Sequence, residues 1–496
     1  MMGKEESKNS KLFWGFDIGS RVPEDHLLRK LNRVLDLKFL YESVADTYGR
    51  NGNVSVPPPV IMKMLLLLSL YNVRSERELM ETIPMRLDWM WFLGYDIDDE
   101  VPNHSVLSKA RKRWGAEVFK ELFRRVLQQA VAASMVEGRK FFVDASLVRA
   151  DASNDSVKTR AALELDPEKY AELIARLDER ENEPRPNGGK YERKNDGHIS
   201  TTDPEATIVS RQHKNAELTY KVHRSTDAKH EIVTTCEMTT GAENEADVLG
   251  KQIEAFRNDT GMNPEVVIAD SKYGTKQNFA ELKEKGYTTH MNDLSDSRKT
   301  AIKRDYGIYE KEAFTYDAER DVYICPAGKE LVRRSRNPLR GWINYNASRL
   351  DCDACPLKPQ CTRSKTGRTI NRFEEDDILA AARKEAHSDA SRKDLKQRQE
   401  LMERSFAYSV RFGYKRARYR GLWRVYIQQL VIATVQNLIR MARHLFPTPN
   451  GGPAIGSSLD LLLAFLTTII ASVALLIRSE PIRWRLALDE KLCRAT

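Results

Sequence analysis

The sequence KFFVDASLVR, from Lys140 to Arg149, places one carboxylate, Asp144, in the middle of a short apolar run. The β-branched and aromatic residues around it are typical of a strand that is buried on both faces. An ionised Asp in such a strand is costly unless it meets a cation or a partner. A lone example is also explained by an Asp that caps a turn, so the role of Asp144 depends on whether partners exist elsewhere in the chain.

The composition favours a large cytoplasmic protein with an anionic partner. At 496 residues the chain is long enough for two or three packed units. Residues 404–447 hold nine Lys or Arg and no Asp or Glu, and residues 329–372 hold eleven basic and three acidic residues. Aromatic residues interleave with both stretches, which favours a polyanion, although a solvated basic face is the alternative. The polar start MMGKEESKNSK predicts no secretory signal, so the six cysteines are expected to be reduced.

Residues 1–135 are predicted to form an all-helical, DNA-binding domain. Apolar residues recur at helical spacing in residues 25–37, 57–70, 75–83 and 106–114. The last of these helices ends in a basic group, and helix-turn-helix modules place such a helix against a DNA groove or phosphates. A surface helix with ordinary charges is the alternative. The cations of this helix are Lys109, Arg111, Lys112 and Arg113.

Residues 136–308 are predicted to begin an α/β domain. After the Asp144 strand, residues 154–200 form a polar insertion with an amphipathic helix from Asp166 to about Glu181. Strands at 218–223 and 231–238, a helix at 244–256 and a strand at 265–269 follow, and Asp270 ends the last strand. This order is the layout of a ribonuclease H-like mixed sheet flanked by helices. In that sheet the first and fourth strands are adjacent, which would bring Asp144 and Asp270 together.

Residues 309–373 are predicted to form a small insertion that contains four cysteines. Three of them follow the spacing C-x2-C-x5-C. Four thiols at this spacing can hold a structural Zn²⁺, and a reduced cysteine knuckle without metal is the alternative. The cysteines are Cys325, Cys352, Cys355 and Cys361.

Residues 374–446 are predicted to complete the α/β domain with a long helix from Asp394 to about Phe412 and a second amphipathic helix. Glu400 and Glu403 on the first of these helices both qualify as a third carboxylate. The basic residues expected to contact DNA are Arg404, Arg411, Lys415, Arg416, Arg418 and Arg420.

Two aspartates and a glutamate on adjacent elements suit a two-metal site for phosphoryl transfer. Carboxylate oxygens bind Mg²⁺ or Mn²⁺, and two such ions can activate the attacking oxygen and stabilise the leaving one. Four other aspartates compete for this role, and for them a turn or a helix cap is the simpler explanation. They are Asp151, Asp155, Asp203 and Asp227.

Residues 447–496 differ from the rest of the chain. A Pro/Gly-rich linker leads to residues 461–477, an uncharged apolar run at the short end of what spans a bilayer. Membrane contact through this run is not the favoured interpretation, because a helix that docks on an apolar patch would have the same composition.

Between Val22 and Leu445 the chain resembles a bacterial insertion-sequence transposase of the DDE superfamily. The resemblance is to the subgroup with a helical N-terminal domain and a cysteine-bearing insertion before the last carboxylate. Many short blocks occur in the order of that family, which is more specific than any one of them. They include VPNHSVLSKARKRWG, FFVDASLVRADAS, YKVHRSTDAKH, ADSKYGT, DCDACPLKPQC, RQELMERSFA and RARYRGLWRV.

The resemblance implies a catalytic and metal-binding set of Asp144, Asp270 and Glu403, since the MERSFA block selects Glu403 over Glu400. It also implies binding to the terminal inverted repeats of a mobile element, metal-dependent hydrolysis at its ends, and strand transfer into target DNA. A homodimer or larger assembly on double-stranded DNA in the nucleoid would join the two ends. Relatives commonly carry a Lys about two turns after the glutamate, where this chain has Ser409 and Val410. A decayed or repurposed copy that binds DNA without cutting it is therefore the alternative.

Overall fold

The structure, a computed structural model, describes residues 17–48, 55–160, 194–210, 215–294, 308–337, 342–373 and 376–447. The chain divides into two compact units. The first unit comprises Met1–Glu243, Lys251–Asn263 and Glu400–Thr496, and the second comprises Asn244–Gly250 and Pro264–Gln399. The helix predicted from Asp166 to Glu181 and the apolar run 461–477 lie outside the described residues.

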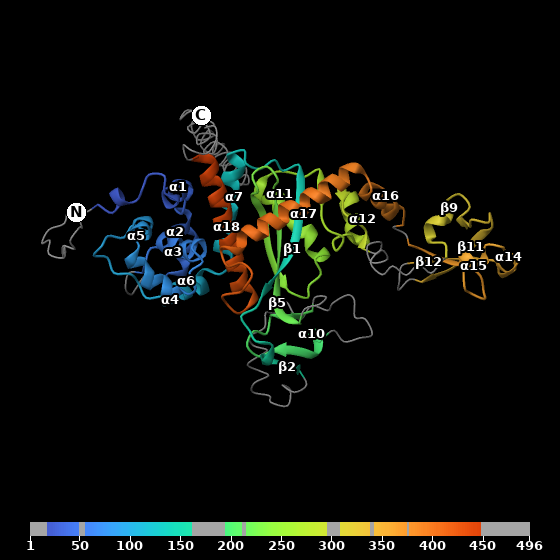
Figure 1. Ribbon diagram of the computed structural model, residues 1–496, viewed down its shortest axis with the longest axis horizontal. Helices are drawn as coiled ribbons and strands as arrows, with labels where there is room; N and C mark the ends of the chain where they lie inside the picture. The colour runs from blue at the N-terminus through green and yellow to red at the C-terminus, as the bar shows by residue number, and fades with distance from the viewer. Residues whose placement is uncertain are drawn as a thin grey trace, which may run out of the picture. The chain divides into compact units, whose positions relative to one another are not determined.

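The N-terminal part of the first unit is helical, as the spacing of apolar residues predicts (Figure 1). Local signals fix several helix ends: Pro58 opens α3, the Ser75 hydroxyl accepts the Glu78 N–H over 3.1 Å at the start of α4, and Gly94 ends α5 at φ +82°. The helices are α1 (Leu27–Val34), α2 (Phe39–Val44), α3 (Pro58–Leu70), α4 (Glu76–Thr82), α5 (Leu87–Leu93), α6 (Ser105–Trp114) and α7 (Glu117–Ala132).

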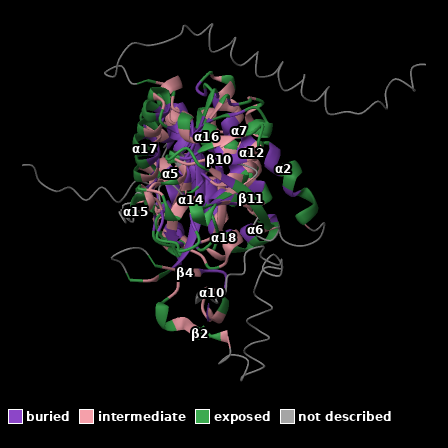
Figure 2. Ribbon diagram, turned by 90° about the vertical axis from the view of Figure 1, so that its right-hand side faces the viewer, coloured by how far each residue is buried: buried purple, intermediate pink, exposed green. Residues whose placement is uncertain are grey.

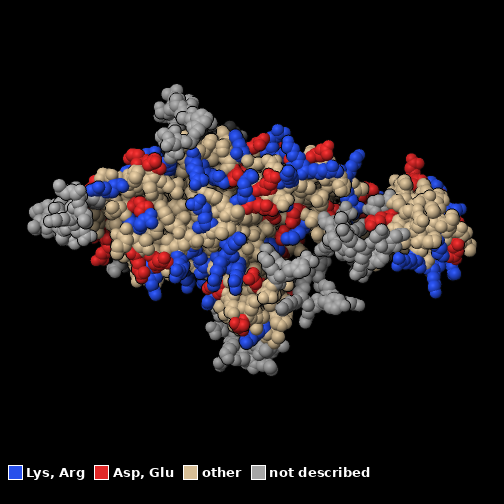
Figure 3. Space-filling view, viewed as in Figure 1, with Lys and Arg blue, Asp and Glu red and all other residues tan. Residues whose placement is uncertain are grey.

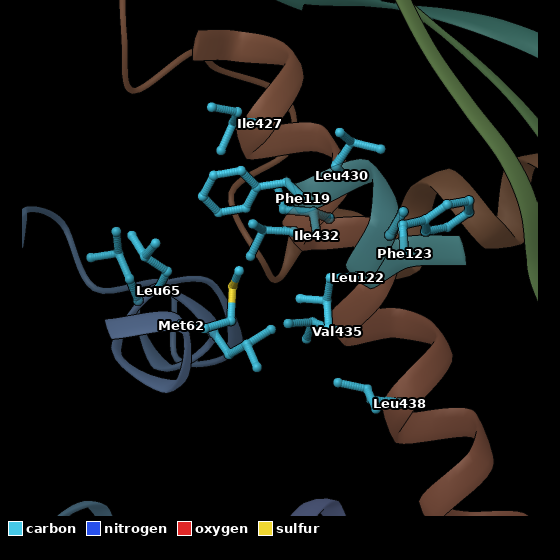
Figure 4. Packing of buried hydrophobic residues seen from close by; sticks show 14 of the residues in the cluster. Met62, Leu65, Phe119, Leu122, Phe123, Ile427, Leu430, Ile432, Val435 and Leu438 are labelled. Atoms are coloured by element: carbon cyan, nitrogen blue, oxygen red, sulfur yellow. The ribbon is translucent and has the colours of Figure 1, made fainter. Parts of the chain in front are cut away.

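Helix α18 (Leu422–Leu445) is the central element of this unit. Sixteen of its residues are buried, and it packs against α1, α3, α7 and strand β6. Figure 4 shows Ile427, Leu430, Ile432, Val435 and Leu438 of α18 beside side chains of α3 and α7. The N-terminal helices and the sheet therefore share one hydrophobic core through α18.

The sheet of the first unit is antiparallel. Strand β5 (Glu217–Thr226) pairs with β1 (Lys140–Arg149) on one side and with β6 (Val233–Thr240) on the other. The short strand β4 (Thr207–Val209) also pairs with β5. Strands β2 (Val157–Thr159) and β3 (His198–Ser200) form a separate pair, and α10 (Lys194–Gly197) precedes β3. Helix α11 (Leu249–Thr260) follows β6, five residues later than the predicted start at residue 244.

The second unit contains two sheets. Strands β7 (Val266–Ile268) and β8 (Thr288–His290) form a parallel pair, with helices α12 (Lys276–Glu284) and α16 (Asp376–Ala386) in contact with β8. A five-stranded antiparallel sheet has the order β13-β12-β11-β10-β9. Its strands are β9 (Thr315–Asp317), β10 (Val322–Ile324), β11 (Glu330–Asn337), β12 (Trp342–Ala347) and β13 (Thr369–Phe373). Two short helices, α14 (Arg349–Asp353) and α15 (Lys358–Cys361), lie between β12 and β13.

The predicted mixed α/β class is confirmed. The structure contains a set of antiparallel strands, a parallel pair of strands, an N-terminal helical region and a small cysteine-containing sheet. This arrangement is consistent with a ribonuclease H-like fold. Helix α17 (Asp389–Val410) carries many exposed residues along its length (Figure 2). Within the described part of the chain, none of the helices combines the length and the hydropathy needed to cross a bilayer.

Candidate active site

Strand β1 presents Asp144 where the strand leaves the core. Residues 141–143 are fully buried, whereas residues 144–147 are half-buried. The Asp144 Oδ1 atom accepts a 2.8 Å hydrogen bond from the backbone N–H of Ala145. In the pairing with β5, Asp144 lies directly opposite Arg224, so their side chains leave the same face of the sheet.

A cavity of about 760 Å³ lies beside Asp144 within the first unit. Glu403, from the part of α17 that belongs to this unit, lines the same cavity. The rings of Phe406 and Tyr414 also line it, stacked with their centroids 5.6 Å apart. The structure thus brings two of the three predicted carboxylates to one cavity with an aromatic wall, and Glu400 is not part of its lining.

Two cations line this cavity as well, Arg149 at the end of β1 and Lys415 after α17. The backbone N–H of Arg149 donates to the carbonyl of Lys415 over 2.9 Å, and the N–H of Ala417 donates to the carbonyl of Arg149 over 2.7 Å. These bonds fix residues 415–417 beside the strand. Cations placed next to carboxylates suit an anionic substrate.

Arg224 joins the sheet to the two long helices and was not predicted from the sequence. Its side chain is fully buried and donates to Ser409 Oγ over 2.8 Å and to Gln429 Oε1 over 3.1 Å. Its guanidinium carbon lies 5.8 Å and 5.7 Å from the ring centroids of Phe406 and Tyr414. Among the described residues, no carboxylate oxygen lies within 4.0 Å of this guanidinium, so hydrogen bonds and aromatic rings surround its charge in the core.

The second unit holds Asp270 just after β7. Its Oδ1 atom accepts a 2.8 Å hydrogen bond from the backbone N–H of Lys272. A carboxylate oxygen of Glu245 lies within 4.8 Å of a carboxylate oxygen of Asp270. The ammonium nitrogen of Lys272 lies 2.8 Å from Glu245 Oε1. Glu245 is 6% exposed. A buried carboxylate this close to Asp270 is a candidate ligand that the sequence prediction missed.

The carboxylates fit a hard divalent cation. Asp and Glu oxygens are the ligands that Mg²⁺ and Mn²⁺ prefer, and carboxylates gathered this closely repel one another unless a cation lies between them. The donor chemistry of each unit is therefore compatible with the predicted metal.

The basic group of α6 is divided between surface and core. Lys109, Lys112 and Arg113 are exposed, and Arg113 also lies over the ring of Tyr48. Arg111 is only 5% exposed, forms an ion pair with Glu76 and stacks on Tyr419 at 4.2 Å. The DNA contact predicted for Arg111 is therefore wrong for this conformation, because its charge is used inside the fold.

The cations after Glu403 are similarly divided. Arg418 is half-buried and donates to Asn72 Oδ1 over 2.6 Å and to the carbonyl of Val73, which gives it a packing role in place of the predicted DNA contact. Burial lowers the pKa of its guanidinium. The other predicted cations are exposed, three of them with ion pairs: Arg404 to Glu231, and Arg416 and Arg420 to Asp151. The exposed set is Arg404, Arg411, Lys415, Arg416 and Arg420.

The four predicted cysteines line one small cavity of about 30 Å³ in the second unit. The backbone N–H of Lys329 donates to Cys325 Sγ over 3.3 Å. Burial raises the pKa of the Cys361 thiol, and the three other cysteines raise it further. A cation between them would remove that repulsion, so the donor set fits Zn²⁺.

Two of the competing aspartates have structural roles. Asp227 Oδ2 accepts the backbone N–H groups of Glu137 and Gly138 over 3.1 Å and 3.0 Å. Asp203 is fully buried and accepts from the Tyr220 hydroxyl over 2.6 Å and from the Gly421 N–H over 3.1 Å. Asp227 Oδ1 also accepts the Lys229 N–H over 2.9 Å, as the predicted turn role requires, whereas Asp203 joins residues that are distant in the chain.

Two family models match the chain. Residues 16–113 match the family described as Transposase domain (DUF772), and residues 324–442 match the Transposase DDE domain. The second match covers the four cysteines and Glu403 but not Asp144 or Asp270. No curated protein matches the chain. A solved structure of the piggyBac transposase synaptic complex with hairpin DNA aligns over 88% of this chain and 86% of that one, at 8% identity and a TM-score of 0.24, which is too low to carry an argument.

The matched families define the class of the protein: it is an enzyme that cuts DNA and transfers the cut ends. More particularly, the chain is a DDE transposase of the insertion-sequence type.

Proposed function

We propose that this transposase binds the terminal inverted repeats of its own insertion sequence, hydrolyses a phosphodiester bond at each end and joins the freed 3′ ends to target DNA. The observation that carries the proposal is the cavity of the first unit, where Asp144 and Glu403 lie beside Arg149 and Lys415. Carboxylates that hold metal and cations that hold phosphate are the two parts that phosphoryl transfer needs.

We propose Asp144, Asp270 and Glu403 as the catalytic carboxylates and the ligands of Mg²⁺ or Mn²⁺. Bound metal would activate the attacking oxygen and stabilise the leaving one. Glu245 is a second candidate for the third position, because it is buried next to Asp270. The role of Lys272 is then to offset the charge that Glu245 brings to the site.

The remaining residues position DNA. Arg149 and Lys415 would neutralise the phosphates that flank the scissile bond, while the stacked rings of Phe406 and Tyr414 close one side of the cavity. Lys109, Lys112 and Arg113 on α6, together with the exposed cations between 404 and 420, would bind the duplex on either side. In this proposal residues 1–135 act as the DNA-binding domain, residues 136–308 and 374–446 as the catalytic domain, and the protein works in the nucleoid as a dimer or larger assembly.

We further propose that Cys325, Cys352, Cys355 and Cys361 hold a structural Zn²⁺ in residues 309–373. The shared cavity and the mutual repulsion of the thiols support this assignment.

A cleavage assay tests the proposed reaction. The substrate is duplex DNA that carries the element's own ends, with Mg²⁺ present. We expect wild-type protein to nick this DNA, whereas Asp144→Asn, Asp270→Asn and Glu403→Gln do not. Asp155→Asn is a matched control, because Asp155 lies in the exposed turn that follows β1.

The same assay separates the candidates for the third carboxylate. If Glu245→Gln abolishes nicking and Glu403→Gln does not, Glu245 replaces Glu403 as the catalytic residue. If wild-type protein binds the ends but never cuts them with Mg²⁺ or Mn²⁺, the alternative of a transposase that binds without cutting is correct.

A further inference from the structure

The five-stranded sheet of the cysteine-containing insertion has two unlike faces. One face carries the small hydrophobic core of this part of the chain, with Leu331, Tyr345 and Ile370 each at most 3% exposed. Because side chains alternate along a strand, the residues directly before and after these three in their own strands point to the opposite face. That opposite face is called the outer face below.

The outer face is mostly polar, and Glu330 at the start of β11, which is ion-paired with Arg320, is the charged residue that the alternation of the paired strands β11, β12 and β13 places on it. The register places Ser335 and Asn371 on either side of Asn344, and Val332 and Thr369 on either side of Asn346. Val332 is 39% exposed, and Ser335, Thr369 and Asn371 are exposed as well, so these side chains reach solvent. The other outer-face residues are Val332, Ser335, Asn337, Trp342, Asn344, Asn346, Thr369, Asn371 and Phe373.

A pair of amides at the centre of this face retains hydrogen-bonding capacity. Asn344 Nδ2 donates to Asn371 Oδ1 over 3.0 Å, which leaves the Asn344 oxygen as an acceptor and the Asn371 nitrogen as a donor. Asn346 Oδ1, in the next outward position of β12, is buried without a hydrogen-bond partner in the described part of the protein. Trp342, two residues before Asn344 on the same strand, adds a half-buried indole.

Exposed cations occur in β11 and in the segment before β13. A β-bulge between Arg333 and Ser335 leaves Arg334 as the extra residue of β11, exposed and without an ion pair among the described residues. Arg363 and Lys365 are exposed in the segment that leads into β13. Figure 3 shows Lys and Arg along one edge of this part of the molecule. Arg334, Arg363 and Lys365 are thus exposed cations that could bind a polyanion.

We propose that the outer face and its cations form a further DNA-contacting surface that takes duplex DNA. Arg334 and Lys365 would bind phosphates, and the amides of Asn344 and Asn371, with Trp342, would face the groove between them. Side chains on β-strands can enter DNA grooves, and amides pair with base edges. This inference rests on the proposed function for its choice of DNA and assigns a contact outside the cavity of Asp144.

Duplex binding by the full-length protein tests this surface. The probe is fluorescent random-sequence duplex DNA, titrated at several salt concentrations without Mg²⁺ and without chelator. We expect the double variant Arg334→Ala/Lys365→Ala to reduce the slope of log K against log salt by roughly 1.8, or about 0.9 for each lost phosphate contact. The control is Arg320→Ala/Arg349→Ala, which removes the same charge from the same sheet region at residues that are exposed and ion-paired.

A second variant tests the amides. Asn344→Ala should weaken binding several-fold while the salt slope stays at the wild-type value, because no phosphate contact is lost. Equal slopes for the two double variants, or an unchanged affinity for Asn344→Ala, would overturn the proposed surface. Since binding is measured without cleavage, these results are independent of whether the wild-type protein cuts DNA.

Discussion

Replacing Arg224 by Met is expected to destabilise the first unit, although the substitution removes a buried charge. Arg224 lies opposite Asp144 on the sheet and donates to Ser409 on α17 and to Gln429 on α18. Glu403 is on the same helix as Ser409. The guanidinium therefore holds the strand that carries one proposed ligand next to the helix that carries another.

The substitution is expected to lower the free energy of unfolding by about 2–4 kcal/mol. A hydrogen bond from a charged donor contributes roughly 1.5–3 kcal/mol, so the two bonds contribute about 3–6 kcal/mol. Returning the guanidinium to water in the unfolded state offsets part of this, because a buried charge carries a desolvation cost of several kcal/mol. Ser409 keeps a bond of 2.7 Å to Gln436 in the variant, whereas Gln429 Oε1 loses the one partner identified for it.

Denaturant unfolding of wild-type and variant protein measures this difference, and Arg443→Met is the matched control because Arg443 is exposed on α18. Nicking by Arg224→Met, measured where the variant is folded, should also fall, and Arg224→Lys should restore part of it. If Arg224→Met is as stable as the wild type, the hydrogen bonds do not outweigh the desolvation cost and the proposed role of Arg224 is wrong.

Three further predictions test other parts of the structure. Burial raises the pKa of Asp203, so its stabilising contribution is complete below the ordinary Asp pKa of about 3.9 and is lost as pH rises through the folded-state pKa. The melting temperature of the wild type relative to that of Asp203→Asn should therefore fall from pH 4 to pH 8. A constant difference between the two melting temperatures would contradict this prediction. Asn437 is fully buried and forms hydrogen bonds of 2.8 Å with both the N–H and the carbonyl of Val233. Because an ionised Asp side chain cannot donate, Asn437→Asp should lower the free energy of unfolding in denaturant by at least about 1–3 kcal/mol. An unchanged unfolding midpoint would show that the hydrogen bond to the carbonyl is dispensable. For zinc, elemental analysis should find about one ion per chain in the wild type and in Cys236→Ser, but less in Cys352→Ser; no zinc in protein purified without chelator would count against the site.

Periodicity predicted the elements that depend on local sequence. The strand at 140–149 is found with the predicted bounds, and the helices at 57–70 and 106–114 are found within one residue of theirs. These segments carry a clear apolar pattern, and their burial follows from it. Helix α11 begins later than predicted because residues 246–248 form a 3-10 turn first.

Contacts between distant residues could not be predicted in the same way. Arg111 and Arg418 look like DNA contacts in a basic sequence, but they meet Glu76 and Asn72, which lie far away in the chain. Glu245 falls in a polar stretch before a helix, where nothing in the local pattern indicates burial. Arg224 sits in an alternating strand, and only the packing of α17 and α18 against β5 encloses it.

The most direct test of metal binding at Asp144 is a ligand substitution. Asp144→Cys replaces a hard oxygen ligand by a thiolate, which Mg²⁺ accepts poorly and Mn²⁺ accepts better. We expect Asp144→Cys to nick the element ends with Mn²⁺ but not with Mg²⁺, while Asp144→Ser stays inactive with both ions. Nicking by Asp144→Ser with Mg²⁺ at the wild-type rate would show that Asp144 is not a ligand of the catalytic metal.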